Sequence, residues 1–271
     1  MIHRNDTLHL SGHAPDVPLT TYILDNSPEV DPQRRRPLVV VCPGGGYAFR
    51  SFREAEPVAV RLNALGFHAC VLHYSVAPEV FPAALLQVLK AIAHVRENAE
   101  AWHVDTDKIA VMGFSAGGHL AASAGVFWSK PHYAELLSLT VDDVKPNALI
   151  LCYPVITSGI NSHGGSIKNL LGDKFDAFKD TMSLENQVDG STPPSFVWHT
   201  WEDDAVPVEN ALLFFSALRK AGVPGELHIF QRGVHGLSLS SDEVYGPDAR
   251  QNIRPEQAHW IDMAAAWLKA L

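Results

Sequence analysis

Residues 113–117 read Gly-Phe-Ser-Ala-Gly and place one serine, Ser115, between two glycines. An apolar run, 108–112, precedes the motif, and a stretch of small residues, 116–127, follows it. This context predicts a sharp turn from a strand into a helix, which holds the serine hydroxyl clear of a sheet. The N-terminal end of the helix carries positive partial charge where an oxyanion would develop. The motif therefore predicts a nucleophilic serine.

A serine hydroxyl is protonated at neutral pH and needs a general base before it can attack a carbonyl carbon. The chain has 14 histidines, of which His235 lies in a glycine-flanked loop, Gly-Val-His-Gly, shortly after the predicted strand 226–230. His119 is nearer to Ser115 in sequence, but four residues into the same helix its side chain should point away from the turn. We therefore predict that His235 is the base.

The base needs a carboxylate that orients the imidazole and stabilises its cation. Residues 201–207 read Trp-Glu-Asp-Asp-Ala-Val-Pro and follow the predicted strand 196–200. The carboxyl ends of strands are where the sites of α/β proteins form. Position alone does not decide between Asp203 and Asp204. With either one, the order along the chain is Ser, Asp, His, which is the order expected of α/β-hydrolases.

Three consecutive glycines, Gly44, Gly45 and Gly46, follow an apolar β-branched run at 38–42. Glycine leaves the backbone N–H groups unobstructed, and two such groups together with the N–H of Ala116 would form an oxyanion hole. A phosphate-binding loop is the competing interpretation. The sequence disfavours it, because neither a Gly-x-Gly-x-x-Gly pattern nor a following Lys is present.

The elements that must position these residues alternate along the chain from residue 37 onward. Apolar runs predict strands at 38–42, 68–74, 108–112, 148–152, 196–200 and 226–230. Helical spacing and end signals predict helices at 54–65, 82–98, 116–127, 208–221 and 255–270, the last opened by Pro255. This alternation predicts an α/β fold with a mostly parallel central sheet and helices on both faces. Residues 8–10 and 19–24 predict a short hairpin at one edge of the sheet.

Residues 155–194 break this alternation, because they are rich in Gly, Ser, Asn and Asp and hold only short helical pieces. A long insertion in a compact domain usually serves function or is disordered. We expect a small cap or rim over the site. Since no linker divides the chain, residues 1–271 are predicted to form a single domain.

Composition restricts the class of protein and its partners. Of 271 residues, 46% are hydrophobic and 19% are charged, as in an ordinary globular protein, and the net charge is −9. A negative surface field disfavours nucleic acids and anionic membranes as partners. The predicted chemistry uses no metal and no cofactor. Cys42, Cys70 and Cys152 each lie in or beside an apolar run, which predicts buried free thiols.

Residues 1–6 lack the apolar core of a signal peptide, and no apolar stretch approaches the roughly 18 residues that span a bilayer. We therefore expect a soluble, cytoplasmic protein. Helices near either terminus could pair in a homo-oligomer.

Taken together, six segments resemble α/β-hydrolase esterases of the hormone-sensitive-lipase and acetyl-esterase type, which include small bacterial carboxylesterases and acetyl xylan esterases. The segments are 42–47, 74–78, 113–119, 163–166, 203–210 and 233–236, so the resemblance covers nearly the whole chain. The family pattern implies that Asp203, the first residue of Asp-x-x-Val-Pro, is the triad acid. It also implies that Gly45 and Gly46 are the oxyanion donors beside Ala116.

One position departs from that pattern. The related lipase motif begins His-Gly-Gly-Gly, whereas this chain has Pro43 before the glycines. Proline cannot supply a side-chain hydrogen bond to brace the glycine loop. The donors themselves are backbone groups, which the change leaves in place.

The residues around the motifs indicate the polarity of the substrate. Near the motifs lie the polar residues Asn161, Ser162, His163 and Ser166 and the aromatic residues Tyr47, Phe49, Trp128 and Trp201. This mixture suits a small or sugar-like alcohol better than a long acyl chain, and the insertion lacks the long apolar helices of a lipase lid. We expect hydrolysis of short acyl esters, acetate first, of carbohydrates or similar small molecules, with Tyr47 and His163 in contact with the substrate.

Three other interpretations stay open at this point. The same triad serves amidases, arylformamidases and serine peptidases, and the same fold carries thioesterases and lactone hydrolases. The third is a catalytically inactive binding protein of hydrolase fold. The joint presence of Ser115, Asp203 and His235 favours an enzyme, a serine hydrolase of carboxylic esters, over such a binding protein.

Overall fold

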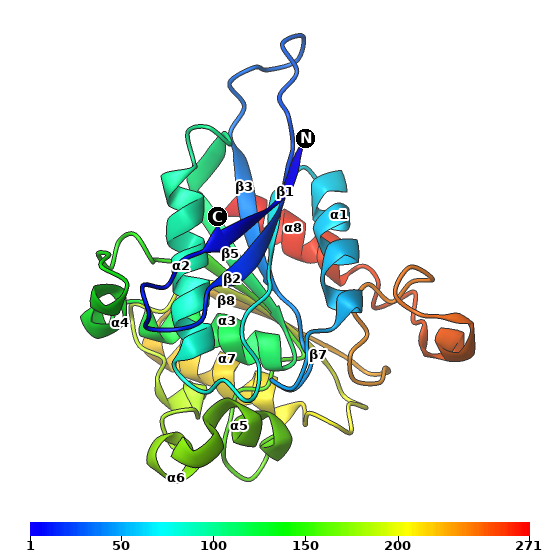
Figure 1. Ribbon diagram of the computed structural model, residues 1–271. Coiled ribbons are helices and arrows are strands. Elements are labelled where there is room, and N and C mark those ends of the chain that lie inside the picture. Colours follow the sequence, from blue (N-terminus) through cyan, green and yellow to red (C-terminus); the bar gives the residue numbers. More distant parts are fainter.

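The computed structural model describes residues 1–271 and contains one eight-stranded sheet (Figure 1). Its strands are β1 (Ile2–Leu8), β2 (Val17–Ile23), β3 (Arg36–Cys42), β4 (His68–Leu72), β5 (Val104–Phe114), β6 (Ala148–Cys152), β7 (Ser195–Thr200) and β8 (Gly225–Phe230). Their order in the sheet is β1-β2-β4-β3-β5-β6-β7-β8. Only β2 runs against its neighbours, β1 and β4, and all other pairs are parallel. The predicted mostly parallel sheet is therefore confirmed.

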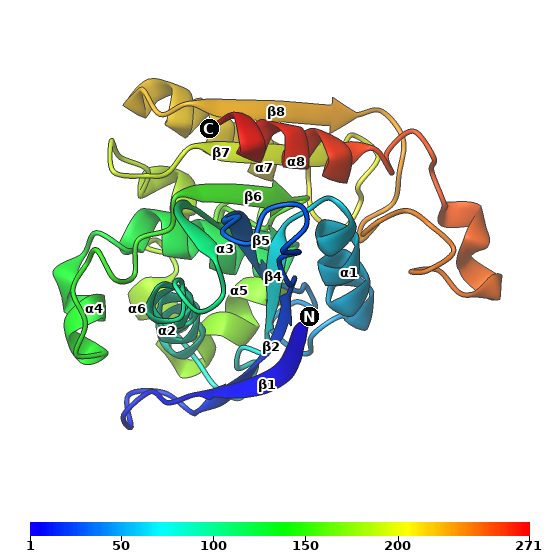
Figure 2. The ribbon, with the colours of Figure 1, turned by 90° about the horizontal axis from the view of Figure 1, so that it is seen from above.

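Helices cover both faces of the sheet, as predicted. They are α1 (Glu56–Ala64), α2 (Ala83–Glu97), α3 (Ala116–Phe127), α4 (Pro131–Leu136), α5 (Gly164–Leu171), α6 (Phe175–Phe178), α7 (Glu209–Ala221) and α8 (Trp260–Ala270). Side chains of α1 and α8 belong to the core on one face, and those of α2, α3 and α7 to the core on the other. Figure 2 shows α1 and α2 on opposite sides of the strands. Alternate residues of β3 enter the two resulting cores, with Val40 on the α3 side and Val41 on the α1 side. A strand buried on both faces needs an unbroken apolar run, which is why the sequence of β3 reveals it.

The order of the strands reverses next to β3, and this reversal opens the site. From β3 the chain passes through α1 to β4 on one side, and then returns through α2 to β5 on the other side. The connections that leave β3 and β5 therefore diverge, and a crevice forms at the carboxyl ends of these two strands. Residues Cys42 and Gly113 are paired at these ends, so the glycine loop and Ser115 emerge side by side.

Three predicted boundaries are wrong by four residues or more, one of them the start of β5, which lies at Val104 and not at 108. The first strand was placed at 8–10, but β1 covers Ile2–Leu8, and Leu10 is buried in the connection to β2. Most residues of this edge strand are polar and exposed, so apolar periodicity does not mark it. The last helix does not open at Pro255: residues 255–259 form turns, and α8 begins at Trp260. Its start is fixed by tertiary contact, since the indole N–H of Trp260 donates to the Ser238 carbonyl oxygen at 2.8 Å.

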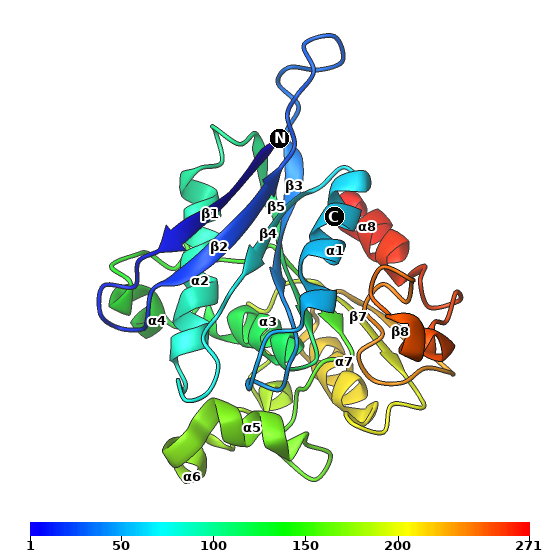
Figure 3. The same cartoon turned by 45° about the vertical axis from the view of Figure 1, so that its right-hand side comes forward.

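Residues 155–194 carry α5, α6 and two short 3-10 helices, at Gly172–Lys174 and Leu184–Asn186. Figure 3 shows α5 and α6 beyond the carboxyl ends of the parallel strands. The glycine loop and Ser115 follow β3 and β5 at this same edge of the sheet. The three cysteines are buried as free thiols in β3, β4 and β6, as predicted. None of the helices combines the length and hydrophobicity that crossing a bilayer requires.

Candidate active site

Ser115 occupies the turn between β5 and α3 in a backbone conformation that side chains rarely adopt, with φ 54° and ψ −118°. Two close approaches require the flanking glycines. A Cβ at Gly113 would lie 2.0 Å from the carbonyl oxygen of Gly117, and a Cβ at Gly117 would lie 2.1 Å from that of Cys42. The predicted strand-turn-helix context of the serine is thus confirmed, and its tight packing explains why glycine stands on both sides.

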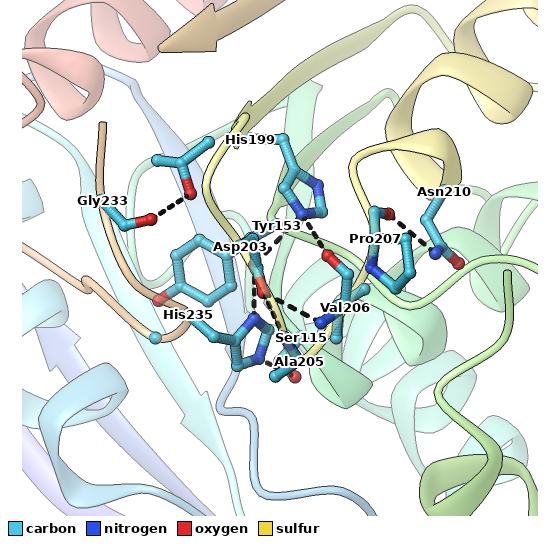
Figure 4. A network of polar contacts seen from close by, with 12 residues as sticks. Ser115, Tyr153, His199, Asp203, Ala205, Val206, Pro207, Asn210, Gly233 and His235 are labelled. Carbon is cyan, nitrogen blue, oxygen red and sulfur yellow. Dashed lines mark hydrogen bonds and ion pairs between the residues drawn. The ribbon is translucent and has the colours of Figure 1, made fainter. Parts of the chain in front are cut away.

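Ser115, His235 and Asp203 form one continuous line of hydrogen bonds (Figure 4). Nδ1 of His235 lies 2.6 Å from Oδ2 of Asp203, and Nε2 lies 2.8 Å from Oγ of Ser115. Because a carboxylate only accepts, Nδ1 carries the proton and Nε2 is left with a lone pair. The imidazole can then accept the serine proton, which is the arrangement that general-base activation of a hydroxyl needs.

The three acids that follow β7 have separate environments. Asp203 is buried and faces His235, whereas Asp204 is exposed and makes no hydrogen bond. Glu202 accepts a hydrogen bond from the Gly233 N–H at 3.2 Å and so holds the loop that carries His235. The geometry thus brings Asp203, and not Asp204, to the histidine.

Asp203 is held as an ionised acceptor. Its Oδ1 accepts hydrogen bonds from the N–H groups of Ala205 and Val206, at 3.1 and 2.9 Å. Its Oδ2 faces the imidazoles of His199 and His235. Burial alone would raise the pKa of Asp203, but hydrogen bonds from His199 and His235 outweigh it and hold the pKa below its ordinary value.

The second imidazole, His199, was not predicted as a site residue. Its Nε2 lies 2.9 Å from the Val206 carbonyl oxygen and 3.2 Å from Oδ2 of Asp203, and both are acceptors. His199 is fully buried at the end of β7, and its Nδ1 has no partner. The one sequence signal was a histidine inside an apolar strand, four residues before the acid.

The glycine loop presents unpaired donors beside Ser115. The N–H groups of Gly45 and Gly46 donate no hydrogen bond within the protein. The N–H of Ala116 is the first of α3 and has no acceptor in its own helix. Gly45 and Gly46 have φ values of +129° and +65°, which favour glycine. A Cβ at Gly45 would also lie 2.2 Å from the Phe49 carbonyl oxygen.

Other residues brace this loop where Pro43 has no side-chain donor. The Tyr74 hydroxyl donates to the Pro43 carbonyl oxygen at 2.5 Å, and the Asn169 amide donates to the Gly46 carbonyl oxygen at 2.9 Å. The Gly44 N–H donates to Oε2 of Glu54 at 2.8 Å. None of these three side chains was predicted as a site residue, because only the tertiary fold brings them to the loop.

A cavity of about 570 Å³ opens over Ser115 and His235. Seven of its thirteen lining residues are polar or charged, four are glycines, and Ala48 and Phe49 are the two hydrophobic ones. His163 lines the cavity at the start of α5, where its Nδ1 lies 2.7 Å from Oγ of Ser166. Burial first, and then the nearby His235, lower the pKa of His163, which favours its neutral form.

Tyr47 lies differently from the expectation of substrate contact. Its side chain is buried, does not line the cavity, and its hydroxyl lies 3.1 Å from Nδ1 of His119. Nε2 of His119 donates to the Met182 carbonyl oxygen at 3.1 Å, which ties α3 to the insertion. His119 thus points away from the Ser115 turn, as predicted. No group of three or more His, Cys, Asp or Glu side chains is arranged to hold a metal ion.

Comparison with known proteins gives relatives over most of the chain. A family model described as BD-FAE matches residues 26–218. Endo-1,4-beta-xylanase B of Butyrivibrio fibrisolvens is 37% identical over 221 residues, which cover 78% of this chain and 34% of that protein. Acetylxylan esterase of Xylanibacter ruminicola is 31% identical over 224 residues, which cover 79% of this chain and 44% of that protein. The chain therefore spans about a third to a half of the length of these relatives.

A solved structure matches over the full chain. The acetyl ester-xyloside bifunctional hydrolase from Caldicellulosiruptor lactoaceticus has a TM-score of 0.83 at 38% identity, and the match covers 100% of this chain and 97% of that one. Unlike the two longer relatives, this protein has nearly the same extent as the chain. The similarity therefore includes the edge strands and the insertion as well as the central sheet.

Proposed function

The chain belongs to the BD-FAE family and has an α/β-hydrolase fold, and on this basis we propose that it is a serine carboxylesterase acting on short acyl esters, acetate first, of carbohydrates or similar alcohols. The observation that carries the proposal is the line of hydrogen bonds from Asp203 through His235 to Ser115, beside two unpaired glycine N–H groups. These groups supply a nucleophile, a base and oxyanion donors, which are the parts that acyl transfer needs.

In the proposed reaction, Oγ of Ser115 attacks the ester carbonyl carbon while Nε2 of His235 takes the hydroxyl proton. The carbonyl oxygen becomes an oxyanion that accepts hydrogen bonds from the N–H groups of Gly45, Gly46 and Ala116. Each such donor typically contributes about 3 kcal/mol of transition-state stabilisation. The tetrahedral intermediate then releases the alkoxide, which leaves as the alcohol with the proton from His235.

The second half of the reaction regenerates the serine. His235 deprotonates a water molecule, which attacks the acyl-serine, and the acid leaves as Ser115 recovers its proton. Asp203 stays ionised throughout and stabilises the imidazolium that forms twice in the cycle. The lowered pKa of Asp203 supports this role, because the carboxylate does not take the proton from the imidazole.

The preference for acetylated carbohydrates rests on the cavity and on the relatives. Its lining offers Ser51, Arg53, His163 and the free amide oxygen of Asn169 as hydrogen-bonding partners. These groups supply the few placed polar contacts that could orient a hydroxyl-rich alcohol in the cavity. One relative is named as an acetylxylan esterase and another as an acetyl ester-xyloside hydrolase, which supports acetyl esters of xylose-containing carbohydrates.

The proposal is tested by a substrate panel in which the Ser115→Ala variant is the blank. Acetate release is measured from acetylated xylo-oligosaccharides and from an aryl acetate, and aryl amides are tried in parallel. Serine-dependent release from both esters is the expected result. Release from the aryl acetate alone would contradict the carbohydrate preference and leave a general short-chain carboxylesterase. Faster cleavage of the amides would contradict the ester preference in favour of an amidase.

A further inference from the structure

The cavity contains a carboxylate that the proposed ester chemistry does not use. Glu54 ends the 3-10 helix Phe52–Glu54, is 2% exposed and lines the cavity. Its Oε2 accepts the Gly44 N–H at 2.8 Å, and its Oε1 accepts the Tyr153 hydroxyl at 2.6 Å. A buried carboxylate is destabilising unless it is paired or hydrogen-bonded. The two hydrogen bonds offset this cost and fix the position of the Glu54 side chain.

Tyr153 contacts the loop that carries His235 and Ser238, which we call the histidine loop. The Tyr153 hydroxyl accepts the Ser238 N–H at 2.9 Å, which leaves its own proton for Glu54. The Tyr153 ring packs edge-on against the His235 ring, with centroids 5.2 Å apart. Burial and then the charge of Glu54 raise the pKa of Tyr153 well above its ordinary value, so the hydroxyl remains a donor. A second bond joins the 3-10 helix of Glu54 to the histidine loop, because Oγ of Ser238 donates to the Arg53 carbonyl oxygen at 2.5 Å.

We propose that Glu54 is a positioning residue that ties the glycine loop to the histidine loop through Tyr153. The bridge fixes the N–H groups of Gly45 and Gly46 relative to the imidazole of His235, and it supplies a brace that Pro43 cannot. A Cβ at Gly44 would lie 2.7 Å from Oε2 of Glu54 and 2.8 Å from the Phe114 carbonyl oxygen, so glycine lets the loop approach both the carboxylate and the end of β5. This inference rests on the proposed esterase function.

The negative charge of Glu54 and its role in aligning the two loops have opposite effects on the rate of ester hydrolysis. The negative charge of Glu54 lies beside the place where the oxyanion forms, and by itself it disfavours that oxyanion. Replacing the carboxylate by an amide would therefore speed the reaction if charge were the main effect. The same replacement would slow the reaction if alignment were the main effect, because a small misplacement of reacting groups lowers the rate by up to about 100-fold.

The experiment compares Glu54→Gln, Tyr153→Phe and the double variant with the wild type. Glu56→Gln is the matched control, since Glu56 accepts only the Tyr22 hydroxyl, at 3.1 Å, outside the cavity. Rates are measured on an aryl acetate and divided by the concentration of active sites, which is titrated with a fluorophosphonate. Unfolded molecules are therefore not counted, and kcat is that of the folded enzyme. Affinity for an aryl trifluoromethyl ketone, whose adduct with the serine carries an oxyanion, is measured beside them.

The bridge predicts that Glu54→Gln lowers kcat about 10- to 100-fold with KM within about twofold, and weakens the ketone by a similar factor. Tyr153→Phe should act in the same direction, and the double variant should be no slower than the slower single variant. Unchanged or raised kcat in Glu54→Gln, or losses that multiply in the double variant, would overturn the bridge while leaving the proposed function intact. Absence of Ser115-dependent hydrolysis in the wild type would overturn both.

Discussion

Replacing Asp203 by Asn tests the assignment of the acid most sharply, because the structure shows what the amide would meet. Oδ1 accepts two backbone N–H groups, so the amide oxygen should stay there and the NH₂ group should take the place of Oδ2. That NH₂ group then faces the nitrogens of His199 and His235, both of which carry protons in the native arrangement. His235 can accept from it only by moving its own proton to Nε2, where the hydroxyl of Ser115 needs a lone pair.

The size of the effect follows from that tautomer change. With Nε2 protonated the base is lost, and an Asp-to-Asn change in a triad of this geometry lowers kcat by about 10⁴, or about 5.5 kcal/mol of activation free energy. The fold should survive, because backbone contacts to the amide oxygen remain. Loss of the charged acceptor for His199 and His235 should lower the free energy of unfolding by about 1–3 kcal/mol.

The assay is hydrolysis of an aryl acetate at pH 7.5 with active sites titrated, alongside urea unfolding. Asp204→Asn is the control, and its kcat should stay within about twofold of the wild type because Asp204 is exposed and unbonded. A large loss in Asp204→Asn with a small one in Asp203→Asn would refute the assignment and transfer the acid role to Asp204.

Two further predictions concern buried groups. Burial holds the pKa of His119 at about 4, below its ordinary 6.5, so the unfolded chain binds a proton that the folded chain resists, and stability should fall as pH drops from 6.5 toward 4. In urea titrations, the free energy of unfolding should drop between pH 7.5 and pH 5 by about 2 kcal/mol less in His119→Gln than in the wild type. An equal drop in both proteins would contradict this prediction. Gly117→Ala should abolish soluble folded protein or lower Tm by more than about 10 °C, since its Cβ would strike the backbone of β3. Gly164→Ala, where a Cβ meets nothing within 4 Å, should leave Tm unchanged, and equal effects of the two changes would count against the packing argument.

The central sheet could be predicted because its parallel strands are buried on both faces. All of β6 and residues 38–42 of β3 are apolar, and prolines soon after both strands mark their ends. The edge strand β1 could not be placed, since it is mostly exposed and its register depends on pairing with β2. The start of α8 depends on an indole contact with a residue 22 positions earlier, which no local pattern records.

The site residues divide in the same way. Ser115, His235 and the acidic turn follow strands directly, so chain order and topology bring them to one edge of the sheet. Glu54 and Tyr153 were not predicted, because their contacts join loops that follow different strands. His199 lies four residues before Asp203, but only the turn after β7 brings the two side chains together. The place of Tyr47 directly after the glycines predicts substrate contact, but its side chain is buried in the core, where its hydroxyl contacts His119.

The most direct test of the account is to identify the residue that becomes acylated. The wild type is reacted with a fluorophosphonate and, separately, with an aryl ester that deacylates slowly, and the adducts are located by peptide mass spectrometry. The account predicts one adduct per chain on Ser115, loss of activity in step with labelling, and no adduct in Ser115→Ala. An adduct on another residue, or a Ser115→Ala variant that keeps the wild-type kcat, would contradict it.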